Sequence, residues 1–242
     1  METLLSTLEW FTNPANWSGG RGIPVRLLEH AELSFIPLLA AAAVAIPAGV
    51  LSGHFRRFQG LGALLSNAGR AIPTLALLVF TLIFVIRVLG VSIRWWPRLS
   101  TMSALFFLAL QPIFANTYTA VRDVDPGIVE AARGMGMRER DIVARTEMPI
   151  AAPVILTAVR ISAVQIVATA PLAALVAGGG LGRFILDGFQ QFRYGQMYGG
   201  ILLVAAFAIV TEWLIDRVER IVVPTGVRGA SVAEVAATGR AV

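Results

Sequence analysis

The segment "EAARGMGMRERDIVARTEMP", residues 130–149, is a short charged stretch near the middle of an otherwise apolar chain. Eight of its twenty residues are charged, whereas only 14% of the whole 242-residue chain is charged and 56% is hydrophobic. About a quarter of the residues of a soluble protein are charged, and the mean hydropathy here is +0.72. The composition therefore predicts a membrane protein in which residues 130–149 lie in water.

Most of the charge lies outside five apolar windows. A helix of about 18 or more largely uncharged residues is long enough to cross a hydrocarbon core about 30 Å thick. We therefore predict an all-α, polytopic membrane protein with five transmembrane helices, at about 33–53, 62–86, 99–119, 150–176 and 196–214. The corresponding divisions are an N-terminal interfacial segment at 1–30, a membrane domain at 31–217 and a tail at 218–242.

The arginines predict the orientation of these helices. Five spans place the two ends of the chain on opposite sides of the membrane. If the segment at 126–148 is cytoplasmic, eleven arginines lie inside and seven outside, which agrees with the excess of cytoplasmic positive charge in membrane proteins. We therefore expect a cytoplasmic-membrane protein with its N-terminus outside and its C-terminus in the cytoplasm.

The residues around the charged segment predict two short helices at 126–148. Asp125 can accept the free amide hydrogens of a helix start, and Pro126 suits the first helical position. Gly134 and Gly136 can adopt the positive φ that ends a helix and turns the chain. The second helix is expected from about residue 137 until Pro149, which begins the next membrane helix.

The paired alanines Ala131 and Ala132 give this segment a second feature. An ordinary solvated loop gains nothing from small residues, whereas a projecting helix that docks on a partner does, because small side chains let the partner's surface approach closely. Docking on a partner and a plain solvated loop are the two interpretations that the residues alone allow.

The spacing of this segment resembles a known motif. Glu130-Ala131-Ala132, with Gly136 six residues after Glu130 and Pro149 thirteen further on, resembles the EAA motif of the permease subunits of ATP-binding cassette (ABC) importers. In that family the loop forms coupling helices that dock into a groove of the cytoplasmic ATPase. The resemblance implies an ATPase-coupling role for Glu130, Ala131, Ala132, Gly134, Gly136 and Pro149, and the fold of a type I importer permease.

Further stretches narrow the resemblance to permeases of osmoprotectant importers, which carry glycine betaine, choline, carnitine and related quaternary amines. They are "IPTLALL" (72–78), "QPIFANTYTAV" (111–121), "EAARGMGM" (130–137), "MPIAAPVILTAVRIS" (148–162) and "GGGLGRFI" (178–185). The chain departs from the family at Thr146 and Met148, where an aliphatic pair is usual, at "VSIRWWPR" and in its tail. A permease for methionine or another small nutrient is the alternative within the importer class.

The resemblance also implies partners: an ABC ATPase that holds ATP and magnesium, a second identical or homologous permease, and an extracytoplasmic substrate-binding protein. The chain contains no lysine, so it cannot form a GxxxxGK[ST] phosphate loop of its own. It has no cysteine and only two isolated histidines, and its arginines form no basic face. We therefore expect no catalytic residue, no metal or cofactor on this chain and no nucleic-acid partner. A secondary transporter or channel, which would need no ATPase, is the main rival class.

Several polar residues within the predicted spans are candidates for the transport pathway or the bundle interior. Arg160 lies about 16 Å along the fourth span, and an arginine at that depth either serves the pathway or pairs with an acidic neighbour. Gln111, Asn116, Thr117 and Tyr118 lie on the third span and either line a pathway or bond between helices. The glycines at 178–182 predict a tight turn that starts a loop reaching to about Gly195.

Overall fold

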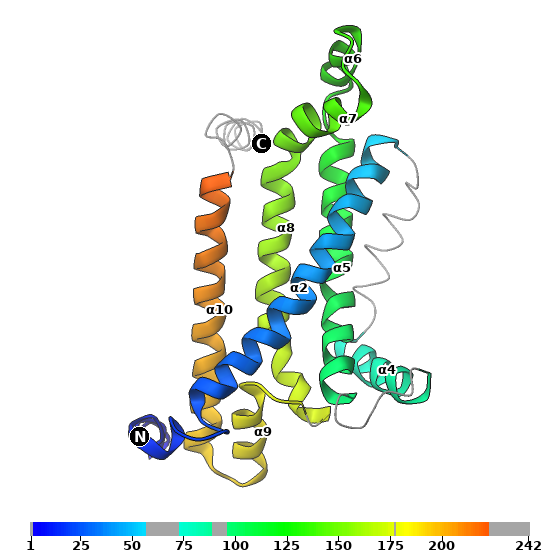
Figure 1. Cartoon of the computed structure of the whole chain (residues 1–242). Helices are drawn as coiled ribbons and strands as arrows, with labels where there is room; N and C mark the ends of the chain where they lie inside the picture. The colour runs from blue at the N-terminus through cyan, green and yellow to red at the C-terminus, as the bar shows by residue number, and fades with distance from the viewer. Residues whose placement is uncertain (1, 57–72, 89–95, 177, 223–242) are drawn as a thin grey trace, which may run out of the picture.

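The computed structural model describes residues 2–56, 73–88, 96–176 and 178–222, and every regular element within these residues is a helix. Four helices are long and apolar enough to cross a membrane: Ile23–His54, Trp96–Arg122, Glu139–Val176 and Tyr194–Ile221. They form a bundle (Figure 1). At one end, called the α6 end, lie α6 (Pro126–Gly134) and α7 (Glu139–Ile142). At the other, called the α9 end, lie α1 (Glu2–Thr12), α4 (Thr74–Arg87) and α9 (Gly182–Gln190). The predicted all-α membrane architecture is confirmed.

Four of the five predicted spans correspond to these helices. The remaining one, predicted at 62–86, is represented by α4 (Thr74–Arg87), which has 14 residues and is about 21 Å long at 1.5 Å per residue. Residues 62–72 of that prediction lie outside the described residues, so a full second span stays a prediction.

The first membrane helix, α2 (Ile23–His54), begins ten residues before the predicted start at 33. The predicted span started after the charged residues at 26–32, but the helix includes them. The domain boundary at 30 stays a prediction. The charges remain within the helix because they are paired. Arg26 contacts Glu29 at 2.8 Å, and Glu32 contacts Arg98 at 2.7 Å, so each acid next to the membrane has a cation.

The other spans also extend beyond their predicted limits. The third predicted span becomes α5 (Trp96–Arg122), and the fifth becomes α10 (Tyr194–Val222). The fourth becomes α8 (Met148–Thr169), followed by a 3₁₀ segment, η3 (Ala170–Val176). Helices tolerate charge at their ends, where long arginine and glutamate side chains reach water, so apolar windows underestimate their length.

Small residues allow α2 and α5 to approach each other closely. Ala41, Ala45, Gly49 and Gly53 recur at every fourth position of α2 and are buried. A Cβ atom at Gly53 would lie 2.9 Å from the backbone oxygen of Tyr118 in α5. Such small-residue stripes are typical of helix contacts in membranes, where van der Waals packing drives association. α5 also packs against α4 and α8, so it is the central helix of the bundle.

The main core lies where α2, α5 and α8 meet. Its buried members are small or aliphatic side chains, which pack densely without polar groups. They are Leu38, Ala41, Ala45, Leu105, Ala109, Ile113, Ala163, Ile166 and Ala170.

The glycine-rich turn at the α9 end is held by α2. Gly180 has φ +82°, and its N–H donates to the Glu29 carboxylate at 2.8 Å across 151 residues of sequence. A tight turn was predicted at this place and is confirmed. The loop predicted from the turn to Gly195 was wrong in part, because α9 (Gly182–Gln190) forms within it. α1 (Glu2–Thr12) and the short η1 (Pro14–Asn16) precede α2, and α1 packs against α10.

Candidate functional site

The projecting loop at the α6 end starts with α6 (Pro126–Gly134), as predicted. The Asp125 carboxylate accepts the Gly127 N–H at 2.7 Å, which is the predicted helix cap. Gly136 has φ +81° and turns the chain, also as predicted. Gly134 differs from the expectation, because it is the last residue of α6 and its φ is not positive.

The second short helix, predicted from residue 137 to Pro149, is not a separate element. α7 (Glu139–Ile142) continues through a π-helical segment, η2 (Val143–Glu147), directly into α8. Pro149 lies half-buried in the first turn of α8. A proline ring clashes with the carbonyl four residues earlier in a regular α-helix, and the wider π turn precedes Pro149 with a bond from the Met148 N–H to the Val143 oxygen. The helix therefore passes the proline instead of breaking there.

One face of α6 forms a small core with the rest of the loop. Ala132 is 3% exposed and belongs to the cluster Val124, Val129, Ala132 and Ile142, with Met137 against it. We expected Ala132 to give a partner close access, but its small side chain lies inside the loop's own core. Adjacent positions on a helix point about 100° apart, so Ala131 and Ala132 cannot both face outward.

The outer face of α6 is apolar and exposed. Ile128, Ala131 and Met135 follow each other at i, i+3 and i+7, which places them on one side of a helix. Ile128 is 45% exposed and Met135 76% exposed. A Cβ atom at Gly134 or Gly136 would meet nothing within 4 Å. This face is therefore open to a partner, and exposed apolar surfaces of this kind mark interaction sites.

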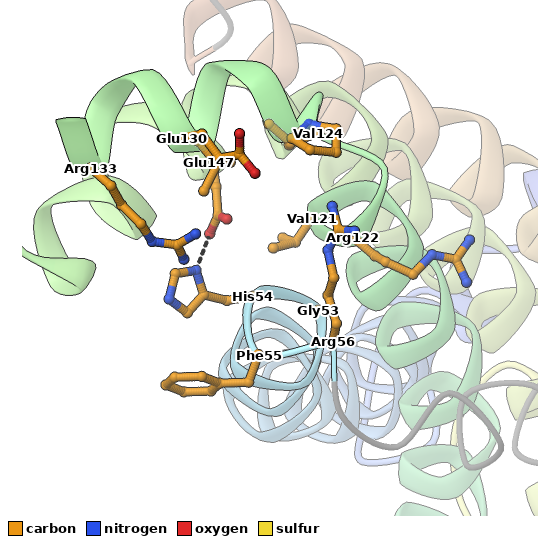
Figure 2. A pocket seen from close by; sticks show the side chains of 12 residues that line it. Gly53, His54, Phe55, Arg56, Val121, Arg122, Val124, Glu130, Arg133 and Glu147 are labelled. Carbon is orange, nitrogen blue, oxygen red and sulfur yellow. Dashed lines mark hydrogen bonds and ion pairs between the residues drawn. The ribbon is translucent and has the colours of Figure 1, made fainter.

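A cleft of about 260 Å³ separates α6 from the ends of the membrane helices (Figure 2). Glu130 is exposed and lines this cleft. Its lining comes from the end of α2, the end of α5, α6 and η2: Gly53, His54, Phe55, Arg56, Val121, Arg122, Val124, Pro126, Val129, Glu130, Arg133 and Glu147.

An ion-pair cluster lies beside this cleft. His54 Nδ1 is 2.8 Å from Glu147 Oε2, and His54 Nε2 is 3.0 Å from Glu139 Oε2. Arg133 donates from Nε and Nη2 to the two oxygens of Glu139, at 2.7 and 3.0 Å. These hydrogen bonds to Glu139 raise the pKa of the Arg133 guanidinium. Within the described parts of the chain, no group of histidine, aspartate and glutamate residues could hold a metal ion.

No pattern in the sequence indicates this cluster. His54 was noted as an isolated histidine, and 93 residues separate it from Glu147. No local spacing relates two residues so far apart, and only the fold brings them together.

Arg160 pairs with acids of α10. Its Nη1 atom is 3.4 Å from both Asp216 Oδ1 and Glu219 Oε2, and the Arg160 side chain is 28% exposed. Thr157 lies 3.5 Å from the other oxygen of Glu219. The sequence could not name this partner, and the structure favours the interpretation in which Arg160 ties α8 to α10.

The polar residues of α5 divide between its two sides. Thr117 and Tyr118 are 0% and 3% exposed, and Thr117 faces Gly49 of α2, so both lie in the bundle interior. Asn116 is exposed and donates from Nδ2 to the Pro112 oxygen of its own helix at 2.7 Å. Gln111 is half-buried.

The structure is a bundle of membrane-length helices with a short helix at one end whose exposed apolar face suits a soluble partner, as in a membrane subunit of a larger assembly. The family of the binding-protein-dependent transport system inner membrane component matches residues 45–224. The chain therefore belongs to this family, the permeases of ABC importers, and the rival class of secondary transporters is not supported.

Named permeases are similar to most of the chain. The choline transport system permease protein OpuBB of Bacillus subtilis (strain 168) is 32% identical over 87% of this chain and 93% of its own length. The carnitine transport permease protein OpuCB of Listeria monocytogenes is 33% identical with the same coverage. The glycine betaine/carnitine/choline permease OpuCB of Bacillus subtilis (strain 168) is 32% identical over 83% of this chain and 88% of its own.

A solved structure shares the fold. An inward-facing form of the MetNI methionine ABC transporter matches with a TM-score of 0.71 and 23% identity, over 88% of this chain and 100% of that chain. The type I importer permease fold predicted from the sequence is thereby confirmed.

Proposed function

We propose that this chain is the permease subunit of an ABC importer that moves a quaternary-amine osmoprotectant, such as glycine betaine, choline or carnitine, into the cell. The proposed substrate class is supported by the relatives that are named for choline, carnitine and glycine betaine. Each of them is 32–33% identical to this chain over at least 83% of its length. The likeness to the methionine transporter concerns the fold alone, because its sequence identity is 23%.

A partner ATPase supplies the energy in this proposal. The outer face of α6 supports it, since Ile128, Ala131 and Met135 present an exposed apolar stripe with the open positions Gly134 and Gly136 beside it. Three further residues complete the proposed coupling site. Glu130 lines the cleft, and Ala132 packs in the core of the loop. Pro149 lies in the first turn of α8. The chain itself takes part in no catalysis, and ATP and magnesium are held by the ATPase.

A second permease, identical or homologous, completes the transport path. The exposed side chain of Asn116 supports a second permease. Asn116 lies on a membrane-length helix, and an amide group that faces lipid is unfavourable even when one of its polar atoms is hydrogen-bonded. A path between two permeases would place this amide beside water or substrate instead. We assign Asn116 to the side of α5 that faces the path, and Thr117, Tyr118 and Arg160 to the bundle interior. Gln111 is half-buried and lies seven residues before Tyr118, so these two side chains share one face of α5.

The proposed cycle follows from these contacts. ATP binding closes the two ATPases, which draw the α6 helices together, and the bundle opens outward to accept substrate from an extracytoplasmic binding protein at the α9 end. Hydrolysis returns the path to face inward. In this arrangement the α6 end is cytoplasmic and the N-terminus is outside.

Competition for uptake tests the substrate class. Cells that lack other osmoprotectant uptake and express the complete importer are given labelled glycine betaine, with an excess of unlabelled choline, carnitine, proline betaine, ergothioneine or methionine. We expect quaternary amines to suppress uptake and methionine to leave it unchanged. Suppression by methionine alone, or no uptake of any quaternary amine, would overturn the proposed substrate.

A further inference from the structure

His54 is the point at which α2 meets the projecting loop. It is the last residue of α2, and its side chain is only 2% exposed. Figure 2 shows the ring directed from the end of α2 toward Glu147. The contacts on its two nitrogens come from different elements, Glu147 of η2 and Glu139 of α7.

Basic and acidic side chains alternate in this cluster. His54 Nδ1 forms a hydrogen bond with Glu147, and His54 Nε2 lies 3.0 Å from Glu139. Glu147, with a side chain 4% exposed, thereby has the polar partner that a buried carboxylate requires. Arg133 pairs with Glu139 and extends the series into α6.

This series of ion pairs runs beside the cleft and joins α6 to the end of α2. α6 itself packs against α7 and η2, while the cleft lies between it and the ends of α2 and α5. The cleft leaves space on the side of α6 that faces α2 and α5. The contacts Arg133–Glu139–His54 are a direct polar connection from the docking helix to α2.

We propose that His54 is a positioning residue that carries the displacement of α6 to α2, so that movement of the docking helix moves the membrane bundle. This inference rests on the proposed coupling of α6 to an ATPase. The π turn at Val143–Glu147 serves the same connection, because it directs Glu147 of the continuous α7–α8 helix against His54.

The ratio of ATP hydrolysed to substrate transported tests this role. In vesicles that contain the complete importer, we expect His54→Gln to raise this ratio by about tenfold, the order of a typical coupling between sites. Glutamine carries both of its N–H donors on one nitrogen, so it cannot contact carboxylates on two sides as the two ring nitrogens of His54 do. His30→Gln is the matched control, since His30 is the other buried histidine, lies in the same helix and contacts only the Val167 oxygen among described polar groups, at 3.2 Å. We expect this control to leave the ratio at the wild-type value.

Glu139→Gln is a second variant that tests the same connection if His54→Gln fails to fold. Glu139 is half-exposed, so its neutralisation leaves no buried charge and should still raise the ratio. A wild-type ratio in a folded His54→Gln or Glu139→Gln importer would overturn the positioning role. A wild-type importer that hydrolyses no ATP during uptake would instead refute the proposed function, and the inference with it.

Discussion

Gly49 of α2 faces Thr117 of α5 so closely that a Cβ atom at Gly49 would lie 2.8 Å from the Thr117 Cβ. The backbone oxygen of Phe114 would be 3.1 Å away, so neither neighbour can yield by rotating a flexible side chain. We predict that Gly49→Val lowers the stability of the purified protein by about 1–3 kcal/mol, the usual effect of overpacking.

Thermal unfolding in detergent measures this effect. Gly20→Val is the control, because a Cβ atom at Gly20 meets nothing within 4 Å. Equal unfolding temperatures for Gly49→Val and wild type would contradict the close α2–α5 contact.

Arg160 is predicted to stabilise the bundle by pairing with Asp216 and Glu219. Arg160→Met keeps the apolar stem but removes the cation that pairs with Glu219, whereas Asp216 keeps Arg220 at 2.8 Å. We expect a loss of about 1.5–3 kcal/mol, as for hydrogen bonds to charged groups. Adding Glu219→Gln removes the carboxylate that is left unpaired and should restore much of the loss. Unchanged stability with abolished uptake in Arg160→Met would instead indicate a role in the pathway.

Single cysteines test the orientation, because the chain has no cysteine of its own. Met135 and Phe192 are 76% and 75% exposed and lie toward opposite ends of the bundle. In intact cells that express this chain alone, we predict that a membrane-impermeant maleimide labels Phe192→Cys. Met135→Cys should be labelled only after permeabilisation. The reverse pattern would place the α6 end outside the cell.

The sequence predicted the features that depend on local chemistry. Four of the spans follow from apolar windows, and the start of α6 follows from Asp125 before Pro126. The start of α2 was placed too late because Arg26, Glu29 and Glu32 look like a solvated break until their partners are known. The π segment was missed because no residue pattern in 143–147 distinguishes it from an α-helix.

Only part of the candidate site could be predicted, because local sequence patterns do not show how side chains pack. The EAA motif located α6, but two adjacent alanines give the same signal in the sequence, and only packing shows that Ala132 points into the loop and Ala131 out of it. The cluster of His54 with Glu147 and Glu139 joins residues 93 and 85 positions apart. Such pairs depend on how whole helices pack, which local patterns do not contain.

A bulky side chain at Gly134 can test whether a partner docks on α6, because this position accepts a side chain without distorting the loop. Gly136 is the less suitable position, because its φ of +81° would strain any side chain. Gly134 is helical and has open space around its Cβ position. We therefore expect Gly134→Trp to leave the loop folded and to obstruct only a partner at the outer face of α6. Gly20→Trp, at the other end of the bundle, is the matched control.

The amount of ABC ATPase that copurifies with the membrane-extracted chain measures docking on α6. We expect the ATPase to copurify with wild type and with Gly20→Trp, and Gly134→Trp to retain at least about tenfold less, which corresponds to a loss of about 1.4 kcal/mol in binding. Absence of any ATPase from the wild-type preparation, together with uptake driven by an ion gradient, would show that this chain is not the permease of an ABC importer.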